Sequence, residues 1–362
     1  MLDRFKVPKE DQIVITEESL RRTVTAIFEK MGLVPEDAAN GADVLVTADL
    51  RGVETHGVSN KMADYVGLYT DGSLNPRPDW RIERESPGTA VIDGDHGLGI
   101  IIGSKAMDIA IEKARKVGVG IVTVHNSGHL GAVGHFAMQA AEADMVGMCG
   151  TATGASILPT FGAETRMGTN PISIAAPARE EPPLLFDAAT SAIAGNKFRL
   201  AARVGADLLP GWISSKDGTP IMEPTQPPSA GEYHMLPLGG IREQGSHKGF
   251  GFALMVETLA TMLSGVLPSM VNPSALARHY FAAYDIAQFT EVATFKANMD
   301  QMLRTLRDTK PAPGHDRVLY PGLAESEEEL VRHANGIPLH REVVDWFDDL
   351  CSELTAPSLV RA

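Results

Sequence analysis

A regular alternation of strand-like and helix-like segments, which begins near residue 88, constrains the fold of this chain more than any other feature. The runs TAVIDGD, VGIVTVHN and MVGMCGTAT combine β-branched and small apolar residues in short stretches, as buried strands do. Between them, GSKAMDIAIEKARKVG and GAVGHFAMQAAEAD have the apolar spacing of helices. Further strands are expected in NPISIAAP, PLLFDAAT and HYFAAYDI. This alternation predicts an α/β protein.

Helices are expected on both sides of this region. Thr16 can cap a first helix that ends at Gly32, Pro35 begins a second that runs to about Ala48, and a third is expected over residues 60–69. Later helices are predicted over residues 245–265, 291–307, 326–335 and 341–354. Because 362 residues are many for one compact domain, we expect two domains, or one large α/β body with helical additions.

Charge and composition exclude several classes of protein. The net charge is −14 and there is no run of lysine and arginine, so we expect no binding to nucleic acid. There is neither an uninterrupted apolar stretch long enough for a membrane span nor an apolar signal-peptide core. Two distant cysteines exclude a disulfide framework. We therefore expect a cytoplasmic protein in which any bound anion needs local positive charge.

Two histidines lie in glycine-containing turns that a ligand can approach. His56 lies in DLRGVETHGVSN, a connection between two predicted helices. His129 lies in VHNSGHLGAVGHF, directly after a strand, where α/β proteins bind their ligands, and Ser127 lies beside it. Histidine titrates near neutral pH, so each is a candidate proton donor or substrate contact, with a purely structural role as the alternative. The histidine spacings match no zinc-ligand pattern, and we predict no metal site.

Two further turns could bind a ligand. Thr169 and Asn170 precede a proline in RMGTNPIS, so their backbone is expected to be extended and their side chains free to hydrogen-bond a ligand. A plain turn is the alternative. Asp187 ends a predicted strand, and Thr190 or Ser191 is expected to cap the next helix, whose free N–H groups could receive an anion.

The segment GGIREQGSHKGFGF predicts a phosphate site at the start of a helix. Ser246 is expected to cap this helix, with His247 and Lys248 in its first turn. The segment differs from a P-loop because the lysine comes two residues late. The dinucleotide fingerprint GxGxxG is also absent, since GDHGLGIIIG lacks its third glycine. The residues alone thus indicate an α/β enzyme with an anion site and two acid–base histidines.

A resemblance to a known family extends this interpretation. The segments RGVETHGV, NSGHLGAVGHF, GTNPIS, DAATSAIAGNK, GWISSKDGTP, SHKGFGFALMVETL and YPG, in this order, resemble the type 2 malate/L-lactate dehydrogenase family. That family includes ureidoglycolate and sulfolactate dehydrogenases, diketogulonate reductase and piperideine-carboxylate reductase. The likeness extends from Leu20 to about residue 350.

The resemblance implies a fold and an activity. The fold would be a non-Rossmann, mixed-sheet NAD(P)-binding α/β domain over residues 81–312, with an additional mainly helical domain from residues 1–80 and 313–362. The activity would be hydride transfer between NAD or NADP and a small 2-hydroxy or 2-oxo acid, or a related cyclic imino acid. The family also implies a homodimer with its active site near the subunit interface.

Roles for individual residues follow from the same resemblance. His56 and His129 would act in catalysis, with Asp187 orienting a histidine. The residues assigned to the cofactor are Ser127, Thr169, Asn170, Asp187, Ala189, Ser191, His247, Lys248 and Gly322.

The substrate contact departs from the family pattern. Family members commonly carry an arginine four residues after the first histidine, and here that position is Asn60. We assign Asn60 and Arg51 to substrate binding and expect Asn60 to disfavour simple acids such as pyruvate and oxaloacetate, because an amide cannot replace a charged clamp. In the alternative, Arg51 or Lys61 supplies the missing cation.

Two other functions remain open from the sequence. One is a metal-dependent hydrolase that uses DGDH at residues 93–96 together with nearby histidines. The other is a sensor that binds the cofactor without turnover, which the loss of the arginine at position 60 makes conceivable.

Overall fold

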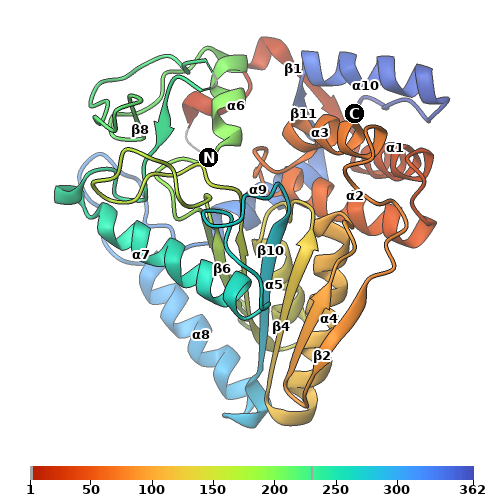
Figure 1. Cartoon of the computed structure of the whole chain (residues 1–362), viewed down its shortest axis with the longest axis vertical. Helices are drawn as coiled ribbons and strands as arrows, with labels where there is room; N and C mark the ends of the chain where they lie inside the picture. The colour runs from red at the N-terminus through yellow and green to blue at the C-terminus, as the bar shows by residue number, and fades with distance from the viewer. Residues whose placement is uncertain (1–2, 230) are drawn as a thin grey trace.

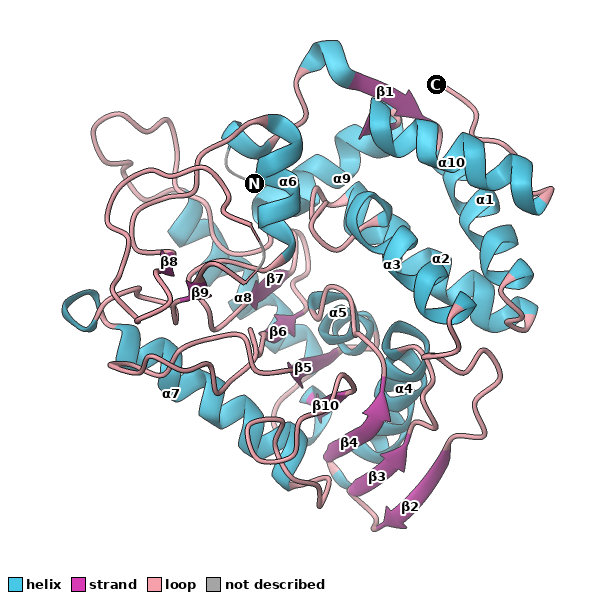
Figure 2. Ribbon diagram, turned by 45° about the horizontal axis from the view of Figure 1, so that its top comes forward, coloured by secondary structure: helices cyan, strands magenta, loops and turns pink. Residues whose placement is uncertain are grey.

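The six predicted strands and one edge strand that was not predicted form one mixed, seven-stranded sheet in the computed structural model, which describes residues 3–229 and 231–362. The sheet fills the lower half of the molecule in Figure 1, and its strands lie in the order β2-β3-β4-β10-β5-β6-β7 (Figure 2). The bounds are Arg81–Glu85 (β2), Thr89–Asp93 (β3), Val119–Ser127 (β4), Met145–Ala152 (β5), Ile172–Ala176 (β6), Leu184–Ala188 (β7) and Ala277–Asp285 (β10). Within this sheet β3 and β4 are parallel and the other neighbouring pairs are antiparallel. This pairing confirms the expected mixed sheet.

Helices cover both faces of the sheet. On one face lie α4 (Gly99–Val117) and α5 (Gly134–Glu142), and on the other lies α7 (Ser246–Glu257), which continues as the π-helix η4 (Thr258–Met262). Gly120 of β4 allows α4 to lie close to the sheet, because a Cβ there would come within 1.8 Å of the carbonyl oxygen of Ala110. The sheet and α4 therefore meet backbone to backbone at this point.

A group of helices packs against this body (Figure 2). It comprises α1 (Glu17–Lys30), α2 (Pro35–Leu50), α3 (Val58–Thr70), α9 (Leu323–Asn335) and α10 (Arg341–Leu354). Thr16 caps α1 as predicted, since its side chain accepts a hydrogen bond from the N–H of Ser19. A small antiparallel sheet of β1 (Gln12–Ile15) and β11 (Ile337–His340), which the sequence analysis missed, joins the two ends of the chain.

The remaining elements are short or lie at the edge. A third, smaller region contains α6 (Asn196–Val204), β8 (Ile213–Ser214) and β9 (His234–Met235), and α8 (Val292–Arg307) follows β10. The short helices are η1 (Asp3–Phe5), η2 (Lys9–Asp11), η3 (Arg242–Gln244) and η5 (Ile286–Gln288). Across the described residues, no helix combines the length and apolar character needed to cross a membrane.

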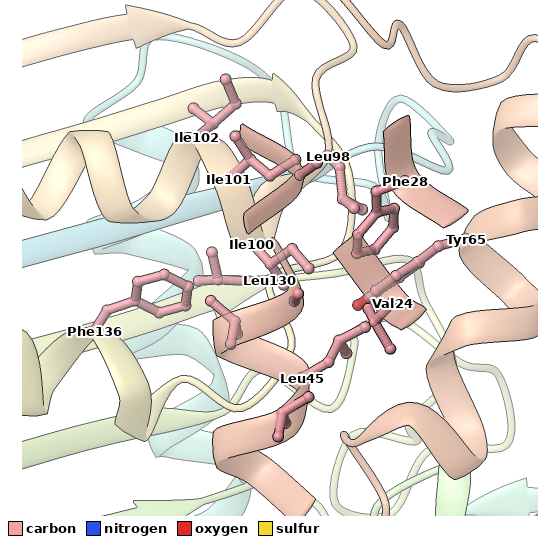
Figure 3. Packing of buried hydrophobic residues seen from close by; sticks show 14 of the residues in the cluster. Val24, Phe28, Leu45, Tyr65, Leu98, Ile100, Ile101, Ile102, Leu130 and Phe136 are labelled. Carbon is pink, nitrogen blue, oxygen red and sulfur yellow. The ribbon is translucent and has the colours of Figure 1, made fainter. Parts of the chain in front are cut away.

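The main hydrophobic core crosses the boundary predicted near residue 80. Val24, Phe28, Leu45 and Tyr65 of the helical group pack in one cluster with residues of α4 and the α5 region, among them Phe136 (Figure 3). A separate cluster joins Phe5 to α6 and to the strands β8 and β9. The helical group therefore shares its core with the α/β body, and a small third unit has a core of its own.

Two predicted helix caps are wrong. Neither Thr190 nor Ser191 caps the helix after β7, because that helix begins at Asn196, and the Ser191 hydroxyl donates to the carbonyl of Ile193. Ser246 is the first residue of α7 and not its cap, and its hydroxyl bonds the hydroxyl of Thr160. After β7 the chain therefore needs extra turn residues before it enters α6, whereas α7 begins one residue earlier than predicted, with Gly245 as its N-cap.

The contact at Gly120 predicts opposite effects for two glycine substitutions. Gly120→Ala should lower the free energy of unfolding by about 1–3 kcal/mol, because the new methyl group meets a backbone carbonyl that only a shift of α4 can clear. Gly67→Ala is the matched control: its Cβ meets nothing within 4 Å, and alanine should stabilise α3 by about 1 kcal/mol. Urea denaturation of both variants measures the difference. Equal stabilities would contradict the close packing.

Candidate active site

A cavity of about 1130 Å³ brings together several of the predicted site residues. Its wall is formed by the α2–α3 loop, the β4–α5 loop, the end of β7 and the beginnings of α6 and α9. The predicted residues at this wall are Arg51, His56, His129, Thr169, Asp187, Ala189 and Gly322. Those outside it are Asn60, Ser127, Asn170, Ser191, His247 and Lys248. The fold thus separates the predicted residues into two groups.

The two candidate histidines lie face to face in the cavity. The rings of His56 and His129 are nearly parallel, with 5° between their planes and 5.8 Å between their centroids. Nδ1 of His56 is 2.9 Å from the hydroxyl oxygen of Thr55, which can act as donor or acceptor. Two turns that are distant in the sequence therefore contribute one pair of imidazoles.

The contacts of His129 define its neutral tautomer. Its Nδ1 accepts a hydrogen bond from the backbone N–H of Gly131 at 3.1 Å and lies 2.7 Å from the hydroxyl of Tyr65. A backbone N–H can only donate, so Nδ1 carries no proton, and the neutral ring holds its proton on Nε2. His129 is therefore built to donate a hydrogen bond from Nε2.

Both histidines are uncharged at neutral pH in the free protein. Burial lowers the pKa of His56 to about 4, and the positive charges of Lys61 and Lys197 contribute to this shift. Burial also lowers the pKa of His129 well below its ordinary value, with Lys61 as a second cause. The cavity thus combines neutral imidazoles with two ammonium groups.

Asp187 does not contact either histidine, contrary to the predicted orienting role. Its carboxylate accepts a hydrogen bond of 2.7 Å from the N–H of Gly134, the first residue of α5. Burial raises the pKa of Asp187 to about 6, although this hydrogen bond opposes the shift. The side chain holds the beginning of α5 at the cavity wall.

Asn60 lies outside the cavity, so the structure does not bring it to the predicted substrate contact. Its side chain is buried and donates to the backbone carbonyl of Glu54 at 2.7 Å. The next residue, Lys61, reaches the wall instead, since one residue turns a side chain by about 100° around a helix. Arg51 also lies at the wall, but its guanidinium is paired with Glu329 at 2.5 Å.

Several residues assigned to the cofactor have structural contacts. The hydroxyl of Ser127 donates to the carbonyl of Gly97, and Asn170 is buried, where its amide donates to Glu257 and to the carbonyl of Ala253. These bonds hold the turns behind the cavity wall. His247 and Lys248 lie in the first turn of α7, as predicted, but there they are exposed and away from the wall.

Most of the chain matches a known family. The family model described as malate/L-lactate dehydrogenase covers residues 15–348. The chain belongs to this family. It is therefore an NAD(P)-dependent oxidoreductase that acts on 2-hydroxy acids, as the ordered motifs implied.

Individual relatives cover nearly the full length of this dehydrogenase. It is 36% identical to a malate dehydrogenase of Pyrococcus abyssi over 97% of both chains, and 34% identical to an L-sulfolactate dehydrogenase of Methanocaldococcus jannaschii over 94% of this chain and 97% of that one. The crystal structure of malate dehydrogenase from Entamoeba histolytica has a TM-score of 0.90 at 33% identity and covers 96% of this chain and 99% of its own. Membership of this family favours the dehydrogenase over the hydrolase considered above.

The cavity wall suits a nicotinamide dinucleotide. The cavity has a volume of about 1130 Å³, which exceeds that of a typical small-ligand pocket, so a dinucleotide and a small acid can both fit in it. Gly322 lies at the wall with a positive φ of 96°, and a Cβ there would come within 2.8 Å of the backbone nitrogen of Leu185. Gly322 thus packs closely against β7 at a point where any other side chain would displace that strand.

A buried network holds the loop that carries His56. Asp49, at the end of α2, accepts a hydrogen bond of 2.7 Å from the N–H of Val58. Arg332 of α9 donates to the carbonyl of Asp49 at 2.7 Å and to the carboxylate of Glu54 at 2.8 Å. These bonds connect the two ends of the loop over residues 49–58 to each other and attach the loop to α9. Neither Arg332 nor Asp49 carried a signal in the sequence, because the contact spans most of the chain.

The burial of Asp49 predicts how stability depends on pH. Burial raises its pKa to about 8, so the folded protein retains a proton there that the unfolded chain loses near pH 4. Between about pH 4 and 8 the contribution of Asp49 to stability therefore falls as the pH rises. Asp49→Asn keeps an acceptor for the N–H of Val58 but does not titrate. Between about pH 5 and pH 8, the free energy of unfolding of this variant should therefore rise relative to that of the wild type by on the order of 1 kcal/mol or more.

Thermal unfolding of both proteins between pH 5 and about pH 8 tests this linkage. Asp345→Asn is a suitable control, because Asp345 is exposed on α10. Parallel stability curves for the wild type and Asp49→Asn would show that Asp49 is ionised in the folded state.

Proposed function

We propose that this dehydrogenase reduces a small 2-oxo acid, and oxidises the matching 2-hydroxy acid, in the cavity around His56 and His129. The observation that carries this proposal is the pair of parallel imidazoles beside two ammonium groups in one cavity. An acid anion fits such a site by charge, and the imidazoles can stabilise and protonate the oxygen of its 2-oxo group.

The two histidines have different tasks in this proposal. When bound, the reduced nicotinamide supplies hydride to the carbon at position 2 of the acid. His129 donates a hydrogen bond from Nε2 to the oxygen on which negative charge develops, while Tyr65 and Gly131 hold Nδ1. His56 gives that oxygen its proton, because its single Nδ1 partner is a hydroxyl that tolerates either protonation state. In oxidation His56 accepts the proton.

Substrate binding prepares His56 for this role. Burial, and to a smaller extent the charges of Lys61 and Lys197, oppose protonation of His56 in the free protein. An acid anion bound beside them offsets these charges and raises the pKa of His56 toward its ordinary value. The general acid is thus formed when its substrate is in place.

The cofactor, NAD or NADP, is proposed to lie along Thr169, Asp187, Ala189 and Gly322, which share the cavity wall with the histidines. His247 and Lys248 are exposed on α7 and do not line this cavity. We therefore do not assign them to the cofactor site of their own chain.

Substitutions at the two histidines test the function and the division of tasks. The wild type should oxidise NADH or NADPH with members of a panel of 2-oxo acids and cyclic imino acids. His56→Ala and His129→Ala should each lower kcat on the best substrate by about a hundredfold or more. His129→Gln should recover part of the loss, because its amide can donate a hydrogen bond, whereas His56→Gln should recover none, because an amide transfers no proton.

Cofactor affinity, measured by NADH fluorescence, should stay unchanged in these variants, and His125→Ala is the control, since His125 pairs with Glu83 outside the cavity. Near-normal turnover in both alanine variants would refute the assignment. Recovery of kcat by His56→Gln would instead assign hydrogen-bond donation to His56 and proton transfer to His129.

We also propose that the protein forms a homodimer through α7 and η4. Exposed apolar side chains gather there, namely Phe252, Leu254, Met255, Met262 and Leu263. A face of this kind is costly to leave in water and suits a second copy of the same chain. His247 and Lys248 lie on the same helix, at its first turn, so a partner's ligand could meet them there.

Replacing Phe252 and Met262 with glutamate should convert the dimer to a monomer in analytical ultracentrifugation, because it buries charge in the interface. Leu330→Glu, on the exposed side of α9, is the control and should leave the dimer intact. A wild type that sediments as a monomer at all concentrations would refute the dimer.

A further inference from the structure

A carboxylate without an ion pair is buried at the end of α7. Glu257 is the last residue of this helix and is only 5% exposed. Across residues 3–229 and 231–362, no cationic side chain lies within ion-pair distance of it. Its partners are neutral, since the hydroxyl of Thr261 donates to Oε1 at 2.9 Å and the amide of Asn170 donates to Oε2 at 3.0 Å. Two neutral donors offset the cost of burying a carboxylate only in part, so stability alone does not explain this side chain.

Arg278 is a cation that feels the charge of Glu257 without pairing with it. Burial lowers the pKa of Arg278, and the charge of Glu257 opposes this shift. The guanidinium donates instead to the hydroxyl of Ser269 and to the carbonyl of Leu276, both at 2.8 Å. The position of the carboxylate is therefore set by its two neutral partners.

The helix geometry changes directly after Glu257. The next residues form the π-helix η4, and short π segments are frequent at functional sites. Thr261, which lies in this segment and is fully buried, occupies one oxygen of the carboxylate. The other oxygen, Oε2, is directed at Asn170.

The contacts of Asn170 allow only one orientation of its amide. Its Nδ2 donates to Glu257 and, at 3.2 Å, to the carbonyl of Ala253, whereas its Oδ1 accepts from the N–H of Thr153 at 3.1 Å. A carboxylate only accepts and a backbone N–H only donates, so a turned amide would lose these bonds. Asn170 is fully buried and has a φ of 33°, a conformation that asparagine tolerates better than most residues do.

Asn170 connects two segments of the cavity wall. The residues of these segments that line the cavity are Thr153, Ser156, Thr169 and Pro171. The segments are in close contact, because a Cβ on Gly168 would come within 2.1 Å of Oγ1 of Thr153. Glu257 does not line the cavity, and its link to the wall runs through Asn170.

We propose that Glu257 is a positioning residue for the nicotinamide cofactor: it orients the Asn170 amide and thereby holds segments 153–156 and 168–171 in the geometry that receives the dinucleotide. This inference rests on the proposed function, which has the cofactor lie along Thr169. Without Glu257, the amide loses a charged acceptor and can turn, so the cofactor must order the wall as it binds. Such a loss weakens cofactor binding and leaves the chemical step at the histidines intact.

Four variants separate positioning from simple stability. Glu257→Met removes both acceptor oxygens and keeps much of the volume. Glu257→Gln removes only the charge, since its amide oxygen can accept from Asn170 while its NH2 group donates to the hydroxyl of Thr261. Asn170→Gly deletes the amide without straining a backbone with positive φ. Ser264→Ala is the matched control, because it deletes another buried hydrogen bond close by, from Ser264 to the carbonyl of Ala260.

Three quantities are measured for each protein: the Tm, the Kd of NADH or NADPH by fluorescence, and kcat at saturating cofactor. The cofactor used is the one that the wild type binds more tightly. Glu257→Met should raise Kd by about tenfold or more, as the loss of a buried hydrogen bond to a charged group implies. Its kcat should stay within about twofold of the wild type. Glu257→Gln should keep Kd within about threefold of the wild type. Ser264→Ala should lower Tm without raising Kd, as a purely structural change does.

A double variant, Glu257→Met with Asn170→Gly, tests the route of the effect. If Glu257 acts through Asn170, the Kd of the double variant should equal that of Asn170→Gly alone, because effects along one chain of contacts are not additive. Additive losses would overturn this route.

Two further outcomes would overturn the proposal. One is a folded Glu257→Met variant with the wild-type Kd, and the other is a Glu257→Gln variant that binds the cofactor as weakly as Glu257→Met. If Glu257→Met does not fold, Glu257→Asp takes its place with the same expected direction, because the shorter side chain withdraws the carboxylate from Asn170.

Cofactor binding is measured without an acid, so failure of the positioning role is distinct from failure of the proposed function. If the wild type reduces no 2-oxo acid but Glu257→Met weakens cofactor binding, the proposed function fails and the positioning role stands. If the wild type reduces 2-oxo acids and all variants bind the cofactor alike, the positioning role fails and the function stands.

Discussion

The position of His56 depends on one buried guanidinium. Arg332 is 6% exposed and bonds the carbonyl of Asp49, the carboxylate of Glu54 and, within α9, the carboxylate of Glu328. A buried ion pair of this kind adds little stability compared with an apolar packing, but it is strongly directional, because each N–H of arginine requires its own acceptor. It therefore defines where the loop after α2 lies, and with it the imidazole that we propose as the proton donor. The N-cap of the same helix α9 is Gly322, which lies on the proposed cofactor wall. One helix near the C-terminus thus connects the two halves of the site.

The mixed sheet explains why this site does not follow the usual dinucleotide pattern. A Rossmann domain places its glycine-rich turn between a strand and the following helix, within a sheet of mostly parallel strands. Here β3 and β4 are the parallel pair, and the long antiparallel strand β10 lies between β4 and β5. The ligand wall is then assembled from the ends of β4 and β7 and from helices of the separate helical group. Here the glycines allow close packing of backbone segments, as Gly120 does against α4 and Gly322 against β7. They do not form a GxGxxG motif.

Charge is distributed unevenly between the two ends of the cavity. Lys61 and Lys197 lie beside the histidines, whereas the region around Arg51 contains the carboxylates of Asp43, Glu142, Glu325 and Glu329. In a protein with a net charge of −14, this separation directs an acid anion to the end where the imidazoles lie. Burial is the main cause of the lowered pKa of His56, and the same two lysines add to it. In the proposed function, an anion bound beside the lysines offsets their charges, so substrate binding favours formation of the general acid.

The sequence by itself determined the elements, the family and the two histidines. Apolar periodicity is a local property, so six strands of the sheet and the helices α1, α2, α8 and α10 were predicted within a few residues, whereas the exposed edge strand β2 was missed. The turns that contain His56 and His129 were recognised from their glycines and from the ordered motifs. Only the tertiary structure decided which neighbouring side chains line the cavity and what they contact: Lys61 lines it and Asn60 does not, and Asp187 bonds to α5 and not to a histidine. Those outcomes depend on the rotation of α3 against the body, on the docking of α6 onto residues 55–60, and on Arg332, which meets Asp49 and Glu54 across most of the chain. Contacts between distant segments leave no periodic signal, because each partner is placed by packing and not by its own neighbours in sequence.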